Sequence, residues 1–121
     1  GLWGIVAGVY LALMGPTGMR ELGESILYRT EHAIALLSAL DGVTVPFAGG
    51  AHFKEFVVSF DANGRTVAEI NAALRDRGIF GGKDLSRELP ALGQSALYCV
   101  TEIHTKGDVE RLASALKEVL A

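Results

Sequence analysis

The sequence predicts an α+β domain of two layers, in which helices pack on one face of a mostly antiparallel sheet of three or four strands. Apolar residues follow helical spacing over residues 16–41 and 66–78. Runs rich in β-branched and aromatic residues, which favour strands, occur at 52–60 and 96–103. The expected order is helix, helix, strand, strand, helix, short strand, strand, helix, and a layer of helices on a sheet accommodates it. With 121 residues, 50% of them apolar, the chain is long enough for one domain with a substantial core.

The charge and the cysteine count exclude several classes of protein. The formal net charge is −3 and the 11 basic residues are scattered, which argues against a nucleic-acid partner. A single cysteine excludes an internal disulfide framework and a cysteine-rich zinc site. A reducing, cytoplasmic location is the expectation that follows.

The first fourteen residues, "GLWGIVAGVYLALM", contain no charged side chain and no initiator methionine. They are too few to span a bilayer, which takes about 20 apolar residues, and they lack the basic flank of a signal peptide. We therefore expect an apolar helix that another layer of protein covers, with no membrane partner. The chain is expected to be a fragment of a larger protein, with 1–41 a helical lead-in and 42–121 an α/β small domain.

The predicted helix over 16–41 begins after the break at "GPTG" (15–18), because Pro16 or Thr17 can open a helix. Its apolar positions are Leu22, Ile26, Ala33, Leu36, Leu37 and Leu40. Gly42 is expected to end it, as glycine commonly does just after a helix.

The next elements alternate between strand and helix. "VTVPF" (43–47) predicts a short edge strand, since Pro46 has no N–H to donate, and "HFKEFVVSF" (52–60) predicts a stronger strand closed by the turn "DANG". The helix over 66–78 should begin at Thr66, with Glu69 completing a capping box.

The last third of the chain predicts a short extended piece, a loop, a strand and a helix. "IFGG" (79–82) is expected to be extended, "KDLSRELPALGQS" (83–95) to be a surface excursion, and "ALYCVTEI" (96–103) to be a strand. The final helix is predicted over 106–120, with Thr105 as the N-cap and Asp108 near the positive end of the helix dipole.

The residues alone indicate no catalytic centre. Cys99 and His104 are five residues apart, so on a strand they would lie about 16 Å from each other on opposite faces. Cys99 is therefore expected to be a small buried hydrophobic residue. The three histidines have no metal-ligand spacing. "FGGKD" (80–84) matches no phosphate-binding motif, and a tight turn is the favoured interpretation.

Four segments, in order, resemble one known family. They are "VYLALMGPTGMRELGE", "FKEFVVSF", "LRDRGIFGGKDLSRELPAL" and "LYCVTEIHTKGDVERLASAL". The first resembles the junction that begins the small domain of fold-type I pyridoxal-phosphate enzymes. All four resemble the C-terminal part of glycine decarboxylase, the P-protein of the glycine cleavage system, and above all subunit 1 of its two-subunit form.

The resemblance implies a function that composition and spacing do not. The family's enzyme decarboxylates glycine with pyridoxal phosphate and transfers the aminomethyl group to the lipoyl arm of the H-protein. It implies a heterotetramer in which the Schiff-base lysine belongs to subunit 2, so this fragment would be inactive alone, with no catalytic, cofactor-binding or metal residue of its own. Its partners would be its own N-terminal large domain, catalytic subunit 2 and the H-protein.

The resemblance also marks a set of residues expected at an interface or near the active site: Glu55, Gly82, Asp84, Thr101 and Glu102. One departure concerns the substrate carboxylate, which many fold-type I relatives hold with an arginine in the last strands. No arginine lies between Arg87 and Arg111, so that role is not carried over.

Two alternatives remain from the sequence. The first is a free-standing regulatory module of ferredoxin-like or similar α+β type that binds a small ligand. The uncharged start argues against it, because exposed apolar patches usually mark interaction sites. The second is a small cysteine-dependent enzyme, which rests on Cys99 alone.

Overall fold

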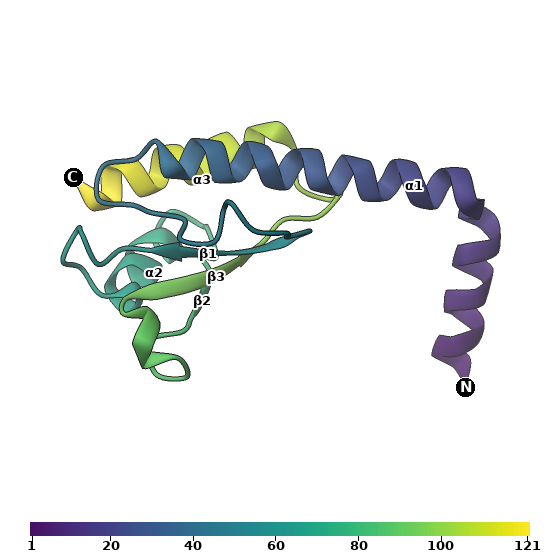
Figure 1. The fold of residues 1–121 in the computed structure, drawn as a ribbon, viewed down its shortest axis with the longest axis horizontal. Helices are drawn as coiled ribbons and strands as arrows, with labels where there is room; N and C mark the ends of the chain where they lie inside the picture. The colour runs from purple at the N-terminus through teal and green to yellow at the C-terminus, as the bar shows by residue number, and fades with distance from the viewer.

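The computed structural model describes all residues, 1–121, and has the predicted α+β architecture of two layers (Figure 1). Three helices and a three-stranded antiparallel sheet account for the fold. The elements are α1 (Leu2–Ser38), β1 (Glu55–Ser59), α2 (Val67–Arg75), β2 (Lys83–Asp84), a 3-10 turn η1 (Pro90–Leu92), β3 (Ser95–Cys99) and α3 (Lys106–Leu120). The predicted fold class is confirmed.

The sheet has the order β1–β3–β2, and β3 pairs antiparallel with both neighbours. Phe56 of β1 lies opposite Tyr98 of β3, and their rings stack with centroids 6.1 Å apart. Because side chains alternate along a strand, one face of the sheet is apolar and buried. That face carries Phe56, Val58, Phe60, Ala96, Tyr98 and Val100.

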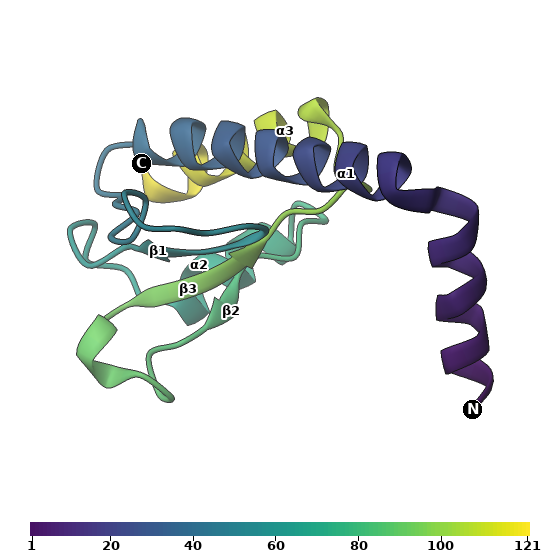
Figure 2. The ribbon, with the colours of Figure 1, turned by 45° about the vertical axis from the view of Figure 1, so that its right-hand side comes forward.

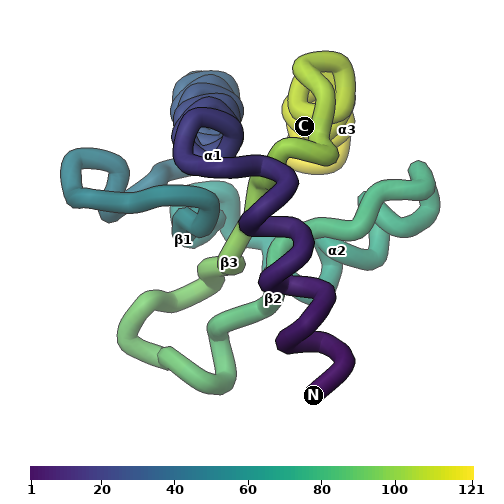
Figure 3. The backbone as a smooth tube through the Cα atoms, turned by 90° about the vertical axis from the view of Figure 1, so that its right-hand side faces the viewer, coloured from purple at the N-terminus to yellow at the C-terminus, as the bar shows by residue number.

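All three helices contribute to the single core on this face of the sheet. Looking along the helices, α1 and α3 lie side by side over the sheet, and α2 lies beside α3 toward β2 (Figure 3). The fully buried side chains of the core include Leu37 of α1, Ile70 and Leu74 of α2, and Leu116 of α3. No helix covers the opposite face of the sheet, which carries Glu55, Val57, Leu97 and Cys99.

The helix α1 contains the predicted break as a sharp bend. Gly15 has φ 63° and ψ 179°, a conformation open to glycine and outside the helical region, and Pro16 follows it. The segment before the bend therefore points away from the rest of the helix (Figures 1 and 2). The helix ends at Ser38, three residues earlier than predicted, and Gly42 turns the chain with φ 75°.

Two strand predictions and one loop prediction need correction. The predicted strand at 43–47 is reduced to one bridge, Thr44 with Ser59, because turns follow from Pro46. The predicted surface excursion at 83–95 contains β2, which pairs with β3, as well as η1. The predicted strand at 96–103 shifts to Ser95–Cys99 and leads into a turn.

The helix starts are confirmed in detail. Thr66 accepts a hydrogen bond from the N–H of Glu69, whose carboxylate in turn accepts from the Thr66 N–H at 2.9 Å. Thr105 and Asp108 make the same reciprocal pair at the start of α3, with the Thr105 N–H at 2.8 Å from the carboxylate. Local sequence alone specifies such caps, because every partner lies within three residues.

Candidate functional site

The single cysteine is exposed, so the expectation of a buried thiol is wrong. Tyr98 and Val100 on either side of Cys99 point into the core, and strand alternation therefore directs the thiol to the face of the sheet without helices. Cys99 stands opposite Glu55 in the register of β3 with β1.

His104 closes the turn between β3 and α3. Its Nδ1 accepts a hydrogen bond of 3.0 Å from the N–H of Thr101. Its backbone carbonyl accepts a hydrogen bond from the guanidinium of Arg29 on α1. Thr101 thus holds the imidazole of His104, and Arg29 of α1 holds the backbone of the same turn.

The five residues marked by the resemblance occupy two regions. Glu55 begins β1, and Thr101 and Glu102 lie in the turn after β3. This turn lies close to the start of β1, because the Val100 N–H donates to the Lys54 carbonyl at 2.8 Å. Glu102 is exposed and makes no hydrogen bond.

Gly82 and Asp84 lie at the other edge of the sheet. Gly82 is buried just before β2, and Asp84 ends β2 and accepts a hydrogen bond of 2.8 Å from the N–H of Ser86. The Ser86 side chain and this N–H hold the pKa of Asp84 below its usual 3.8. The structure therefore does not bring the five residues into one site.

The glycines of "FGGKD" allow close packing. A Cβ on Gly82 would lie 2.6 Å from the Tyr98 ring, and one on Gly81 would lie 2.0 Å from the Asn71 side chain. Asn71 in turn donates to the Gly82 carbonyl at 2.9 Å. The segment runs without a turn past α2 and continues into β2, so the tight turn predicted for 80–84 is wrong.

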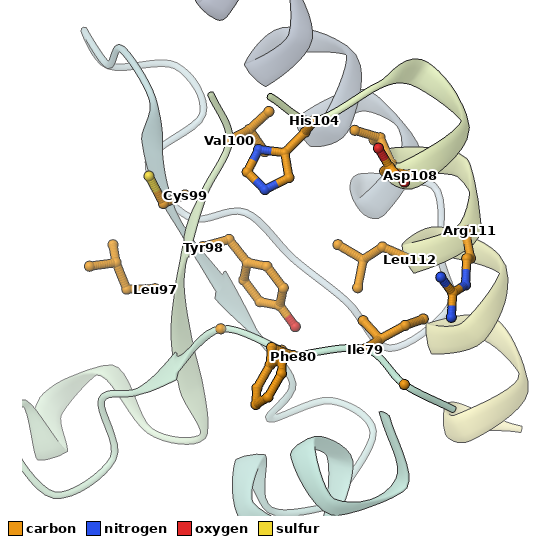
Figure 4. Close-up of a pocket in the computed structure, with 14 residues that line it drawn as sticks. Ile79, Phe80, Leu97, Tyr98, Cys99, Val100, His104, Asp108, Arg111 and Leu112 are labelled. Carbon is orange, nitrogen blue, oxygen red and sulfur yellow. The ribbon is translucent and has the colours of Figure 1, made fainter. Parts of the chain in front are cut away.

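A cavity of about 450 Å³ lies between this glycine loop, β3 and the first turns of α3 (Figure 4). Its walls are mainly apolar, and the imidazole of His104 borders it at one end. The side chains that define it are Ile79, Phe80, Tyr98, His104, Arg111 and Leu112.

The ring of Tyr98 projects into this cavity (Figure 4). The residue is 5% exposed, and its hydroxyl is buried with no hydrogen-bond partner. Burial raises the pKa of Tyr98 to about 12. The adjacent Gly82 backbone lowers this pKa, although Gly82 and the Tyr98 hydroxyl do not have the geometry of a hydrogen bond. Buried polar atoms are normally paired, so this hydroxyl is a candidate for binding.

Sequence reasoning did not single out Tyr98 or Arg111. The alternation in "ALYCV" was sufficient to place Tyr98 inward. The cavity itself depends on three segments far apart in the sequence, and no local signal predicts their meeting.

The potential metal ligands and the lysines of the chain are scattered. No group of three or more His, Cys, Asp or Glu side chains lies together. All four lysines are exposed, and two of them are paired with carboxylates, Lys83 with Glu88 at 2.8 Å and Lys106 with Glu110 at 3.6 Å. A Schiff-base lysine usually lies in a desolvated pocket, whereas these four side chains lie on the surface.

The segment before the bend, residues 2–14, is called the apolar arm below. Its large side chains stand in solvent, with Leu2 74%, Trp3 85% and Leu13 84% exposed. By length and composition alone α1 is a candidate membrane span. The arm itself reaches about 20 Å at 1.5 Å per residue, less than the roughly 30 Å of a bilayer core.

Comparison with known proteins identifies relatives of the chain, although no family model matches it. "Probable glycine dehydrogenase (decarboxylating) subunit 1" of Staphylothermus marinus is 38% identical over 116 residues, 96% of this chain and 24% of that protein. The protein of the same name in Thermococcus onnurineus is 40% identical over 115 residues, 95% of this chain and 24% of its own length. The chain thus spans about a quarter of the length of these relatives.

A solved structure has the same fold. The crystal structure of glycine decarboxylase (P-protein) of the glycine cleavage system, in inhibitor-bound form, superposes with a TM-score of 0.79 and 33% identity. The match covers 92% of this chain and 24% of the P-protein chain. Over nearly its whole length the chain is therefore similar to a segment that makes up about a quarter of proteins named glycine dehydrogenase (decarboxylating) subunit 1 and of the P-protein structure.

Proposed function

We propose that this chain is the C-terminal small domain of subunit 1 of a glycine decarboxylase, the P-protein of the glycine cleavage system. The observation that carries the proposal is the agreement of sequence and fold over nearly the whole chain, 96% of it in the first relative and 92% in the P-protein structure. The assembled enzyme would decarboxylate glycine and transfer the aminomethyl group to the lipoyl H-protein.

The domain's own contribution would be structural. Pyridoxal phosphate would supply the electron sink for decarboxylation in the assembled enzyme, but the exposed lysines of this chain do not fit its Schiff-base site. We propose, as the resemblance implies, that the cofactor and its lysine belong to subunit 2.

The apolar arm supports the proposal that this domain packs on an N-terminal large domain. Monomeric proteins rarely leave a contiguous apolar patch of this kind in water. The relatives are about four times longer than this chain, so their remaining length is ample to provide the covering layer.

The contacts with subunit 2 would use the uncovered face and ends of the sheet. Glu55, Thr101 and Glu102 lie at one end of it, and Asp84 lies at its edge strand. These residues are proposed as interface or active-site-proximal residues of a cytoplasmic heterotetramer, with neither nucleic acid nor membrane as partner.

Reconstitution tests the proposal. The protein encoded by the full reading frame is purified with subunit 2 and H-protein, and glycine-dependent release of carbon dioxide is measured with and without residues 1–121. Activity that requires this segment is expected. The isolated chain mixed with pyridoxal phosphate should give no aldimine absorbance band, and a lysine-linked band would contradict the assignment of the cofactor to subunit 2.

The alternative of a free-standing regulatory module predicts different behaviour. A reading frame without a preceding large domain, together with a monomeric chain that unfolds cooperatively at high concentration, would support the alternative and overturn the proposal.

A further inference from the structure

The cavity beside Tyr98 has the features of a ligand site that the proposed function does not use. Its volume of about 450 Å³ lies within the range of small-molecule pockets, roughly 300–1,000 Å³. The Tyr98 hydroxyl in its wall is buried and has no partner, so a ligand that reaches this hydroxyl would make one hydrogen bond that the folded chain leaves unmade.

The polar groups around the cavity are mainly donors. Because the Nδ1 of His104 accepts from the Thr101 N–H, neutral His104 carries its proton on Nε2. Arg111 makes no ion pair, and one of its guanidinium nitrogens donates to the Arg77 carbonyl at 2.9 Å. A ligand with a hydrogen-bond acceptor and negative charge complements this set, whereas an ammonium group does not.

The one carboxylate at the cavity, Asp108, is already committed. It accepts hydrogen bonds from the N–H and the hydroxyl of Thr105 at 2.8 and 2.7 Å. Figure 4 shows Asp108 toward His104, whereas the Tyr98 hydroxyl points toward Ile79 and Phe80. The acceptor group of a ligand therefore belongs at the hydroxyl end, away from Asp108.

The apolar part of the site favours a ring. Phe80 is 91% exposed beside the cavity, and Tyr98, which is 5% exposed, lines the same space. Aromatic rings gain from packing edge-to-face or offset with other rings, and Ile79 and Leu112 supply the remaining apolar contacts.

We propose that this cavity binds a small aromatic monocarboxylate, whose carboxylate accepts a hydrogen bond from the Tyr98 hydroxyl and whose ring lies between Tyr98, Phe80 and Leu112. The positive charge of Arg111, at the rim of the cavity, favours binding of the anion. The site is separate from glycine chemistry and does not depend on the proposed function.

The test is a titration of the chain with phenylacetate, followed by NMR of ¹³C-labelled tyrosine and phenylalanine. We expect saturable shifts at Tyr98 and Phe80. Tyr98→Phe removes only the hydroxyl and should weaken binding about tenfold or more, because a hydrogen bond to a charged group is lost. Tyr28→Phe removes a hydroxyl from a residue that is 76% exposed on α1 and serves as the matched control.

Two further arms make the result decisive. The cation 2-phenylethylamine should bind far more weakly than phenylacetate. The titration is then repeated with the longer protein encoded by the full reading frame, where binding should persist. Absence of binding, binding unchanged in Tyr98→Phe, or binding that disappears in the longer protein because another segment fills the cavity would each overturn the proposal.

Discussion

At Gly82 the backbone passes directly against the ring of Tyr98, so this position tests the packing of the glycine loop. In Gly82→Ala the new Cβ would lie 2.6 Å from the ring and 2.8 Å from the Leu97 carbonyl oxygen. Relief of this overlap should lower the free energy of unfolding by about 1–3 kcal/mol in urea titrations. Gly49→Ala, where nothing lies within 4 Å, is the control, and equal stability of the two variants would show that the loop relaxes freely.

Cys99 illustrates what a residue pattern leaves open. Free cysteines are commonly buried, but the two faces of β3 differ, and the phase of the alternation decides which side chains enter the core. We expect the thiol of the folded chain to react with a disulfide reagent about as fast as the thiol of the chain in denaturant. Cys99→Ser should change the free energy of unfolding by less than about 0.5 kcal/mol. Strong protection in the folded chain would contradict the exposed position.

Among the elements, the helices were predictable and the strands were less so, for a physical reason. The starts of α2 and α3 depend on partners within three residues, Thr66 with Glu69 and Thr105 with Asp108, so local sequence specifies them. The strand β2 has two residues and exists only because β3 lies beside it. Likewise, "VTVPF" has strand composition but forms one bridge, because pairing partners decide strands and cannot be read locally.

The two capping boxes should make stability depend on acid pH. Hydrogen bonds from the backbone and side chain of Thr66 lower the pKa of Glu69, and those from the side chain and backbone of Thr105 lower the pKa of Asp108. Near pH 4 the unfolded chain therefore binds more protons than the folded chain. The stabilisation is present above the ordinary carboxylate pKa values and is lost as the pH falls through the lowered pKa values of the folded chain. Urea titrations between pH 7 and pH 3 measure this loss.

Thr105→Ala isolates one cap. At pH 7 it should lower the free energy of unfolding by about 1 kcal/mol, the usual cost of losing a threonine N-cap. The difference between the variant and the parent chain should shrink as pH falls, because protonated Asp108 no longer accepts the bonds. A difference that stays constant from pH 7 to pH 3 would contradict a role for the charged carboxylate.

For the whole molecule, the predicted layers were correct because the apolar periodicities of 16–41, 52–60 and 66–78 select one buried face each. The sequence did not predict the cavity, because Phe80, Tyr98 and Leu112 belong to three segments that meet only in the folded chain. Nor did local pattern reveal a function; the likeness to glycine decarboxylase came from the order of four segments along the chain.

The apolar arm gives the last prediction, which concerns the proposed packing of this domain on a large domain. Every side chain from Leu2 to Leu13 is exposed, so the arm adds nothing to the core. A chain that begins at Gly15 should therefore keep its free energy of unfolding within about 0.5 kcal/mol. It should also be monomeric by light scattering, whereas the chain with the arm should self-associate, because burial of apolar surface drives association.

The double variant Val9→Lys/Leu13→Lys separates the arm's surface from its length. It should be monomeric like the shortened chain. In the longer protein it should weaken the proposed contact with a large domain, seen as faster proteolysis at the bend near Gly15. Tyr28→Lys adds one charge to an exposed site on the folded part of α1 and should change neither property. If the chain with an intact arm stayed monomeric and did not bind the large domain, the arm would not be the surface that joins this domain to the rest of its protein.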